Sequence, residues 1–316
     1  WICSDVWMDT LPFFDHAQLG LKLALLSPRF DVLVDKHFDG KSKLPIWRTI
    51  EIHKCIESKT KAAAFLIRAK SVEFPLPDRP LPNKIRFKCL FIRYIDHSVI
   101  AFLRLNKEIF DGRGANFDLS VRSSNGDVQP IWEVLARQIL PIFVPNIRHL
   151  KFTAVGHLED LIFASPTILF DLDINSIESC NFEFYLLTDK NATARKVVSK
   201  WLHTPTKDGQ PKRLRCTDTD ISRNIKWIND FKEKFIGANT SVNFIVHFLL
   251  YPSTPIVPFA LVNNRINQKL TLSKETDYYW VMKRCQIGQI VQWEEQNLAD
   301  NLNNVNFMLY ADYHWV

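Results

Sequence analysis

The sequence predicts an α+β protein in which three short helices precede an α/β body, and a small antiparallel meander follows. Apolar residues recur at helical spacing within the first forty residues. From about residue 84, segments with helical and strand periodicity alternate, which is typical of parallel strands with helices packed on the sheet. After residue 258, three strand-like segments follow one another with short connections, as in a meander.

The composition is that of a globular chain. Its 316 residues carry 40 Lys and Arg against 34 Asp and Glu, a formal net charge of +6, and 47% are hydrophobic. This balance excludes a disordered or collagen-like chain. No apolar run approaches the ~18 residues that cross a bilayer. The six cysteines form no C-x-x-C pair, which argues against a zinc site. Cys89 and Cys216 lie in apolar, strand-like stretches that are typical of buried reduced thiols, so we expect a reducing compartment, the cytoplasm or the nucleus.

The first forty residues predict three helices. The first has apolar residues at i, i+4 and i+7 and should end near Pro12, because proline interrupts a helix. The second is expected over 15–26, and the third starts at Ser27-Pro28 and ends near Gly40. Helices of about ten residues are marginal alone. Because these carry more apolar surface than so small a bundle can hide, part of it should pack on the body or on a partner.

This segment resembles an F-box. The family pattern has an acidic residue, a valine and a hydrophobic residue at its start, matched here by Asp5-Val6-Trp7. A short aromatic or leucine helix end follows, at Leu11-Pro12-Phe13-Phe14, and then a leucine helix that closes on Ser-x-x-Phe, at 19–30. The Leu-Pro pair that usually opens an F-box is replaced by Ile2-Cys3-Ser4. The whole chain is similar to nematode F-box proteins with a diverged C-terminal F-box-associated domain.

The resemblance implies a substrate-recognition adaptor of a Skp–cullin–F-box ubiquitin ligase. Its N-terminal helices would bind a Skp-family adaptor and, through it, a cullin scaffold, while the body would hold an unknown target protein for ubiquitination. Such a chain is a non-catalytic subunit that needs no cofactor or metal and binds neither nucleic acid nor membrane. The residues expected to contact the adaptor are Val6, Trp7, Leu11, Phe14, Leu19, Leu25 and Phe30.

A second class of function stays open. The same helices could complete the core of a secreted binding protein, such as a parasite effector, with no ligase role. A segment before Trp1 with a charged start and an apolar run of about 7–15 residues would favour this alternative. An unrecognised enzyme ranks third, because the sequence contains no G-x-S-x-G, H-E-x-x-H or G-x-G-x-x-G motif.

A proline-rich stretch is expected to divide the rest of the chain. Strands predicted at 46–52 and 64–67 precede four prolines within residues 75–82, which are incompatible with a helix or a central strand. We therefore expect three units: an F-box over 1–40, a strand pair with the proline-rich seam over 41–82, and a substrate-recognition domain over 83–316.

Helices and strands alternate within that last domain. The asparagine or proline before several strands, with a leucine near their ends, resembles a degenerate leucine-rich array without a fixed period. Strands are predicted at 85–92, 117–121, 147–152, 213–216 and 242–250, and helices at 96–110, 131–142, 192–203 and 221–235. The meander should occupy 259–262, 269–272 and 278–284, followed by a helix over 290–300 and a strand over 305–310.

Four groups of side chains could take part in catalysis or binding, but for each of them we favour a structural role. Asp171 and Asp173 are expected on the solvated edge of a strand, and the basic stretch 207–215 in a solvated turn. His247 is expected as a hydrogen-bonded core histidine, and Tyr278-Tyr279-Trp280 as core packing of a strand. No catalytic site is predicted.

Overall fold

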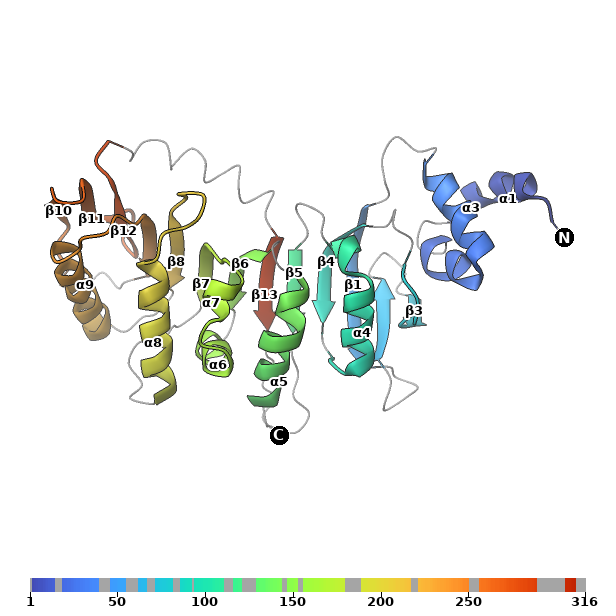
Figure 1. Cartoon of the computed structure of the whole chain (residues 1–316), viewed down its shortest axis with the longest axis horizontal. Coiled ribbons are helices and arrows are strands. Elements are labelled where there is room, and N and C mark those ends of the chain that lie inside the picture. Colours follow the sequence, from blue (N-terminus) through green and yellow to red (C-terminus); the bar gives the residue numbers. More distant parts are fainter. Residues whose placement is uncertain are drawn as a thin grey trace.

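The protein has a mixed α+β fold, as the sequence predicts. The structure, a computed structural model, describes residues 2–14, 19–39, 46–54, 62–66, 72–81, 86–92, 94–110, 116–120, 129–143, 147–152, 156–179, 189–216, 221–249, 256–288 and 305–310. Within these residues the strands form one sheet in the order β10-β11-β12-β9-β8-β7-β6-β13-β5-β4-β1-β2-β3. The N-terminal helices lie beyond the β3 end of this sheet (Figure 1).

The N-terminal segment forms a small helical unit. It contains α1 (Ser4–Thr10), a 3-10 turn at Leu11–Phe13, a π turn at Leu19–Leu23, a 3-10 turn at Ala24–Leu26 and α3 (Pro28–Asp39). Pro12 stands where α1 gives way to the 3-10 turn, as expected from its missing N–H. Part of the second predicted helix, 15–18, lies outside the described residues. The unit encloses its own apolar core, made of Leu11, Leu19, Ala24, Leu33, Val34 and Phe38.

A series of parallel strands forms the centre of the sheet. In space it runs β1 (Ile46–Lys54), β4 (Arg86–Ile92), β5 (Asn116–Ser120), β13 (Val305–Tyr310), β6 (Ile147–Phe152), β7 (Ser176–Ser179), β8 (Lys212–Cys216) and β9 (Phe244–Leu249). Antiparallel strands extend both edges: β2 (Ala62–Leu66) and β3 (Val72–Pro75) on one side, β12 (Tyr279–Gln286), β11 (Gln268–Lys274) and β10 (Phe259–Asn263) on the other. The predicted meander is therefore present, whereas the last strand lies inside the parallel series, between β5 and β6.

The helices that the structure describes in the body lie on one face of the sheet (Figure 1). They are α4 (His97–Leu105), α5 (Gln129–Val134), α6 (His157–Ala164), α7 (Ile168–Asp171), α8 (Asp189–Leu202) and α9 (Ile221–Ile236). Burial along β8 shows the asymmetry, since Leu214 and Cys216 are buried while Arg215, between them, is exposed. Because alternate residues of a strand point to opposite faces, we call the face that carries Arg215 the open face.

The proline-rich stretch does not interrupt the sheet. Strand β1 pairs with β4 in parallel, from Ile46 opposite Arg86 to Ile52 opposite Ile92. Leu81, near the end of the stretch, is buried in the main core, and its N–H donates to the Asn106 side-chain oxygen at 2.7 Å. The structure thus joins β1, β2, β3 and Leu81 to the body, where the sequence suggested a boundary. Prolines are tolerated here because β3 is an edge strand with one partner.

Two local expectations were wrong. Asp171 ends helix α7, and Asp173 lies in a turn with a left-handed φ of 51°, so neither belongs to a strand. Lys212 of the basic stretch is buried rather than solvated, because its ammonium donates to the Trp201 carbonyl at 2.5 Å and lies 5.2 Å from the indole. The sequence reading also missed α6, α7 and β7. The helix predicted over 290–300 lies outside the described residues.

Candidate functional site

The structure places the seven predicted adaptor-binding residues in different environments. Leu11 and Leu19 are fully buried in the core of the helical unit, so they support the unit from within. Leu25 is half-buried and packs against the main core of the body. The rings of Trp7 and Phe30 meet edge to face with centroids 4.8 Å apart, and both side chains are half-buried.

The remaining predicted residues, Val6 and Phe14, are open to solvent, with 54% and 38% of their surface exposed. Phe13, which the sequence analysis did not select, is 88% exposed. It follows Pro12 in the 3-10 turn, where the helical spacing used for the prediction no longer applies. Among the described residues of this unit, the exposed large apolar side chains are those of Ile2, Val6, Phe13, Phe14, Leu26 and Val32.

The open face of the sheet carries rows of polar side chains. In one row, Lys151, Glu178, Arg215 and His247 are direct neighbours on adjacent parallel strands. Lys151 Nζ lies 3.0 Å from Glu178 Oε1, and the Arg215 guanidinium lies 5.9 Å from the Tyr279 ring. Regular spacing of parallel strands brings these charges together, although they are far apart in the sequence.

Two open-face histidines are neutral near pH 7. Burial lowers the pKa of His149 to about 4 and outweighs nearby Glu178, which raises it. His149 Nδ1 is 2.8 Å from the Ser176 hydroxyl. Burial also lowers the pKa of His247 to about 4, helped by the positive charges of Arg215, Lys283 and Arg213. His247 is thus half-buried among cations, not in the apolar core where the sequence placed it.

These pKa values predict an acid-sensitive fold. The unfolded chain protonates both histidines near pH 6.5, whereas the folded chain resists protonation until about pH 4. The unfolded state therefore binds more protons in this window, and the free energy of unfolding should fall as the pH drops from 6.5 to 4. Urea titrations at pH 7, 5.5 and 4.5 measure this loss, and it should be smaller in His149→Gln/His247→Gln. An equal loss in this variant would assign the acid sensitivity to other groups, such as His203 or the carboxylates.

The aromatic triplet of the meander divides between the two faces. Trp280 is buried in the main core, as predicted, while Tyr278 and Tyr279 are exposed. Tyr279 lies on the open face, opposite Leu249 of β9 and near Arg215. The open face therefore carries an aromatic side chain on β12, next to Arg215.

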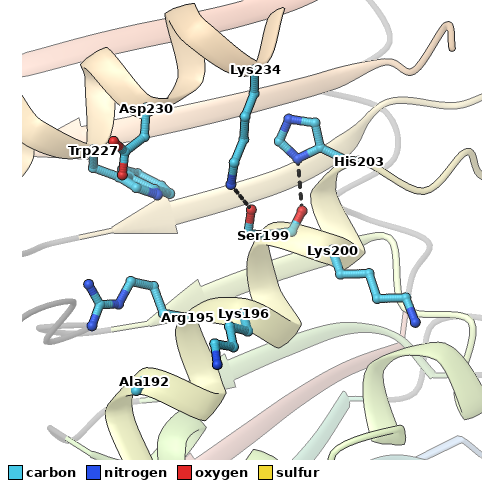
Figure 2. A pocket seen from close by; sticks show the side chains of 9 residues that line it. All are labelled: Ala192, Arg195, Lys196, Ser199, Lys200, His203, Trp227, Asp230 and Lys234. Carbon is cyan, nitrogen blue, oxygen red and sulfur yellow. Dashed lines mark hydrogen bonds between the residues drawn. The ribbon is translucent and has the colours of Figure 1, made fainter. Parts of the chain in front are cut away.

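A groove of about 660 Å³ lies between α8 and α9 (Figure 2). Along α8 its lining residues recur at i, i+3, i+4, i+7 and i+8, so they share one face of the helix. On the opposite wall, α9 contributes residues at i, i+3 and i+7. The complete lining is Ala192, Arg195, Lys196, Ser199, Lys200, His203, Trp227, Asp230 and Lys234.

Two hydrogen bonds order the end of this groove near His203 (Figure 2). Lys234 Nζ donates to the Ser199 hydroxyl across the groove at 2.7 Å, and His203 Nδ1 donates to the Ser199 carbonyl at 2.8 Å. The His203 ring stacks on Phe231 with centroids 5.7 Å apart. Burial lowers the pKa of His203, and the charges of Arg284 and Lys234 lower it further, although the Ser199 carbonyl opposes them. A neutral imidazole therefore supports this end of the groove.

The sequence predicts the helix at 192–203 but not the groove. Its spacing of Arg195, Lys196 and Lys200 is also that of an ordinary solvated helix face. Only the position of α9 beside α8 supplies the second wall and its Lys234. No local signal in the sequence could have indicated this pairing.

Metal and membrane features are absent from the part of the chain that the structure describes. There, no three His, Cys, Asp or Glu side chains gather as metal ligands, and no helix is long and apolar enough to span a bilayer. Comparison of the chain with models of protein families, with curated proteins and with solved structures gave no match.

Proposed function

We propose that the chain is the substrate-recognition adaptor of a Skp–cullin–F-box ubiquitin ligase. One observation carries the proposal: a small helical unit with its own core, at one end of a long sheet, exposes large apolar side chains. Phe13, Phe14 and Val6 expose apolar surface to water, and exposed apolar patches mark interaction sites. Aromatic side chains such as Phe13 and Phe14 contribute much of the binding energy at protein interfaces. The F-box resemblance covers the same segment.

The body has the form that such an adaptor needs. Its helices pack on one face of the sheet. The other face carries the half-buried Lys151 and Glu178 and the exposed Arg215 and Tyr279. A surface of this kind can hold a target protein while the partner enzymes transfer ubiquitin. The chain then contributes positioning alone, which by itself accelerates a transfer reaction.

The proposal predicts that Phe13→Asp/Phe14→Asp will not co-purify with a Skp-family adaptor that binds the unmodified chain. Large aromatic anchors contribute about 2–4 kcal/mol each, so affinity should fall at least about 30-fold. Because Phe13 and Phe14 are exposed and lie outside the core of the helical unit, circular dichroism and thermal unfolding should stay unchanged. Titration with purified adaptors by isothermal calorimetry gives the affinities.

A matched control is Val257→Asp/Tyr278→Asp, which places two charges at exposed apolar positions of the body and should preserve binding. Equal binding by the Phe13/Phe14 variant would place the contact elsewhere on the chain. Failure of the unmodified chain to bind any Skp-family adaptor would refute the ligase role and favour the secreted binding protein.

A further inference from the structure

The α8/α9 groove concentrates positive charge. Four of its nine lining residues are cationic, namely Arg195, Lys196, Lys200 and Lys234, against the single carboxylate of Asp230. The whole chain, by contrast, has an excess of only six positive charges over 316 residues. Lys196, Lys200 and Lys234 are exposed, and Arg195 is half-buried. Such a cleft attracts anions because its walls exclude part of the solvent that would screen the charges.

These cations are not neutralised within the groove. Lys234 donates to a neutral hydroxyl, that of Ser199, and Lys200 Nζ lies 5.4 Å from the Phe170 ring. Among the side chains that the structure describes, no carboxylate forms an ion pair with Arg195, Lys196, Lys200 or Lys234. The groove can therefore bind negatively charged groups without first breaking an ion pair of these four side chains.

The spacing of the cations fits an extended acidic segment. Arg195 and Lys196 lie about one helical turn from Lys200, or roughly 6–7.5 Å at 1.5 Å per residue. Acidic side chains at positions i and i+2 of an extended peptide point to the same side and are roughly 6.6–6.8 Å apart. Lys234 reaches from α9 toward Ser199, which lies on α8 between Lys196 and Lys200 (Figure 2). The volume of about 660 Å³ lies within the range of specific binding pockets.

We propose that this groove binds an acidic segment of a partner protein, in which two carboxylate or phosphate groups lie two residues apart. A nucleic acid fits less well, because the cations are confined to one short groove and Asp230 would oppose a continuous phosphate backbone. If the chain is a ligase adaptor, the segment belongs to its target, and that step rests on the proposed function. The binding itself does not depend on it.

Fluorescence anisotropy with the full chain tests the proposal. The probes are labelled Gly/Ser-rich peptides that carry Glu-x-Glu, phosphoserine-x-phosphoserine or Gln-x-Gln, and a labelled single-stranded RNA. We expect the acidic peptides to bind at least tenfold more tightly than the Gln peptide at 50 mM salt, and more weakly at 200 mM. Tighter binding of the phosphopeptide would identify phosphate as the preferred group. Equal binding of all peptides, or tighter binding of the RNA, would overturn the proposal.

Charge reversal locates the site. Lys196→Glu/Lys200→Glu changes two exposed groove residues and should weaken binding of the acidic peptides at least tenfold. Lys207→Glu/Lys274→Glu changes the net charge equally outside the groove, at positions whose surface ion pairs add little to stability. This control should keep nearly full affinity. Equal losses in both variants would show a general charge effect and overturn the assignment to the groove.

The two proposals fail separately. The Lys196/Lys200 variant should still bind the Skp-family adaptor, because its helical unit is unchanged. Loss of adaptor binding by the unmodified chain, with peptide binding intact, would refute the ligase role alone. Intact adaptor binding without any peptide binding would refute the acidic-segment site alone.

Discussion

Deletion of residues 289–316 is expected to abolish the cooperative unfolding of the body. The deletion removes β13, which pairs in parallel with β5 on one side and with β6 on the other. Each lost backbone hydrogen bond costs on the order of 1 kcal/mol, and two strands would expose unpaired edges to water. The sum is comparable with the roughly 5–15 kcal/mol that separates folded and unfolded domains. Differential scanning calorimetry should show no sharp transition.

A shorter deletion separates loss of the strand from loss of the chain end. Removal of 311–316 leaves β13 intact and should keep the melting temperature within a few degrees of that of the unmodified chain. A cooperative transition after removal of 289–316 would show that β5 and β6 do not require the strand between them.

Gln268→Leu should destabilise the fold by about 3 kcal/mol. Arg284 is fully buried, and its guanidinium donates to Gln268 Oε1 and to the Thr240 carbonyl, both at 2.8 Å. Burial already lowers the pKa of this guanidinium to about 10. The substitution removes one acceptor from a buried charge and also leaves the Val242 carbonyl without the Gln268 donor at 2.7 Å. Loss of a hydrogen bond to a buried charge is strongly destabilising, because the charge stays removed from water and has lost a partner. Urea denaturation at pH 7 measures the change.

The double variant Gln268→Leu/Arg284→Met tests this explanation. It removes the charge together with its acceptor, and replacement of a buried polar pair by apolar side chains of similar size is often close to neutral. The double variant should therefore be more stable than Gln268→Leu alone. The unfolding free energy of Arg284→Met completes the comparison. If the double variant loses as much unfolding free energy as Gln268→Leu and Arg284→Met together, the two residues act independently.

The elements that could be predicted from the sequence are those with a local periodic signal. Helix α9 and strand β9 have clear periods of 3.6 and 2 residues. Asp96, the first residue of the helix predicted over 96–110, caps α4 by accepting from the Val99 N–H at 3.0 Å. Helix α6 was missed because it is apolar on nearly every side and also buries Glu159 and Asp160, so it shows no polar face. Its burial depends on neighbours that the local pattern does not reveal.

The pairing of strands that are far apart in the sequence could not be predicted either. The strand at 305–310 was found from its composition, but its insertion between β5 and β6 depends on pairing partners more than 150 residues away. For the same reason the continuity of β1 with β4 was not foreseen. In the helical unit, helical spacing selected the exposed Val6 and Phe14 together with the buried Leu11 and Leu19, because spacing alone does not distinguish exposed from buried positions.

The central position of β13 has a consequence for synthesis of the chain. Strands β5 and β6 leave the ribosome well before β13 is synthesised. Until then, the position between them in the sheet stays empty. At about 5–20 residues per second, more than 150 further residues mean a delay of the order of 10–30 seconds. During this time the strand edges are open to pairing with other chains. We expect newly made chains to need chaperone protection until β13 is inserted, and chains terminated early to be recognised as misfolded.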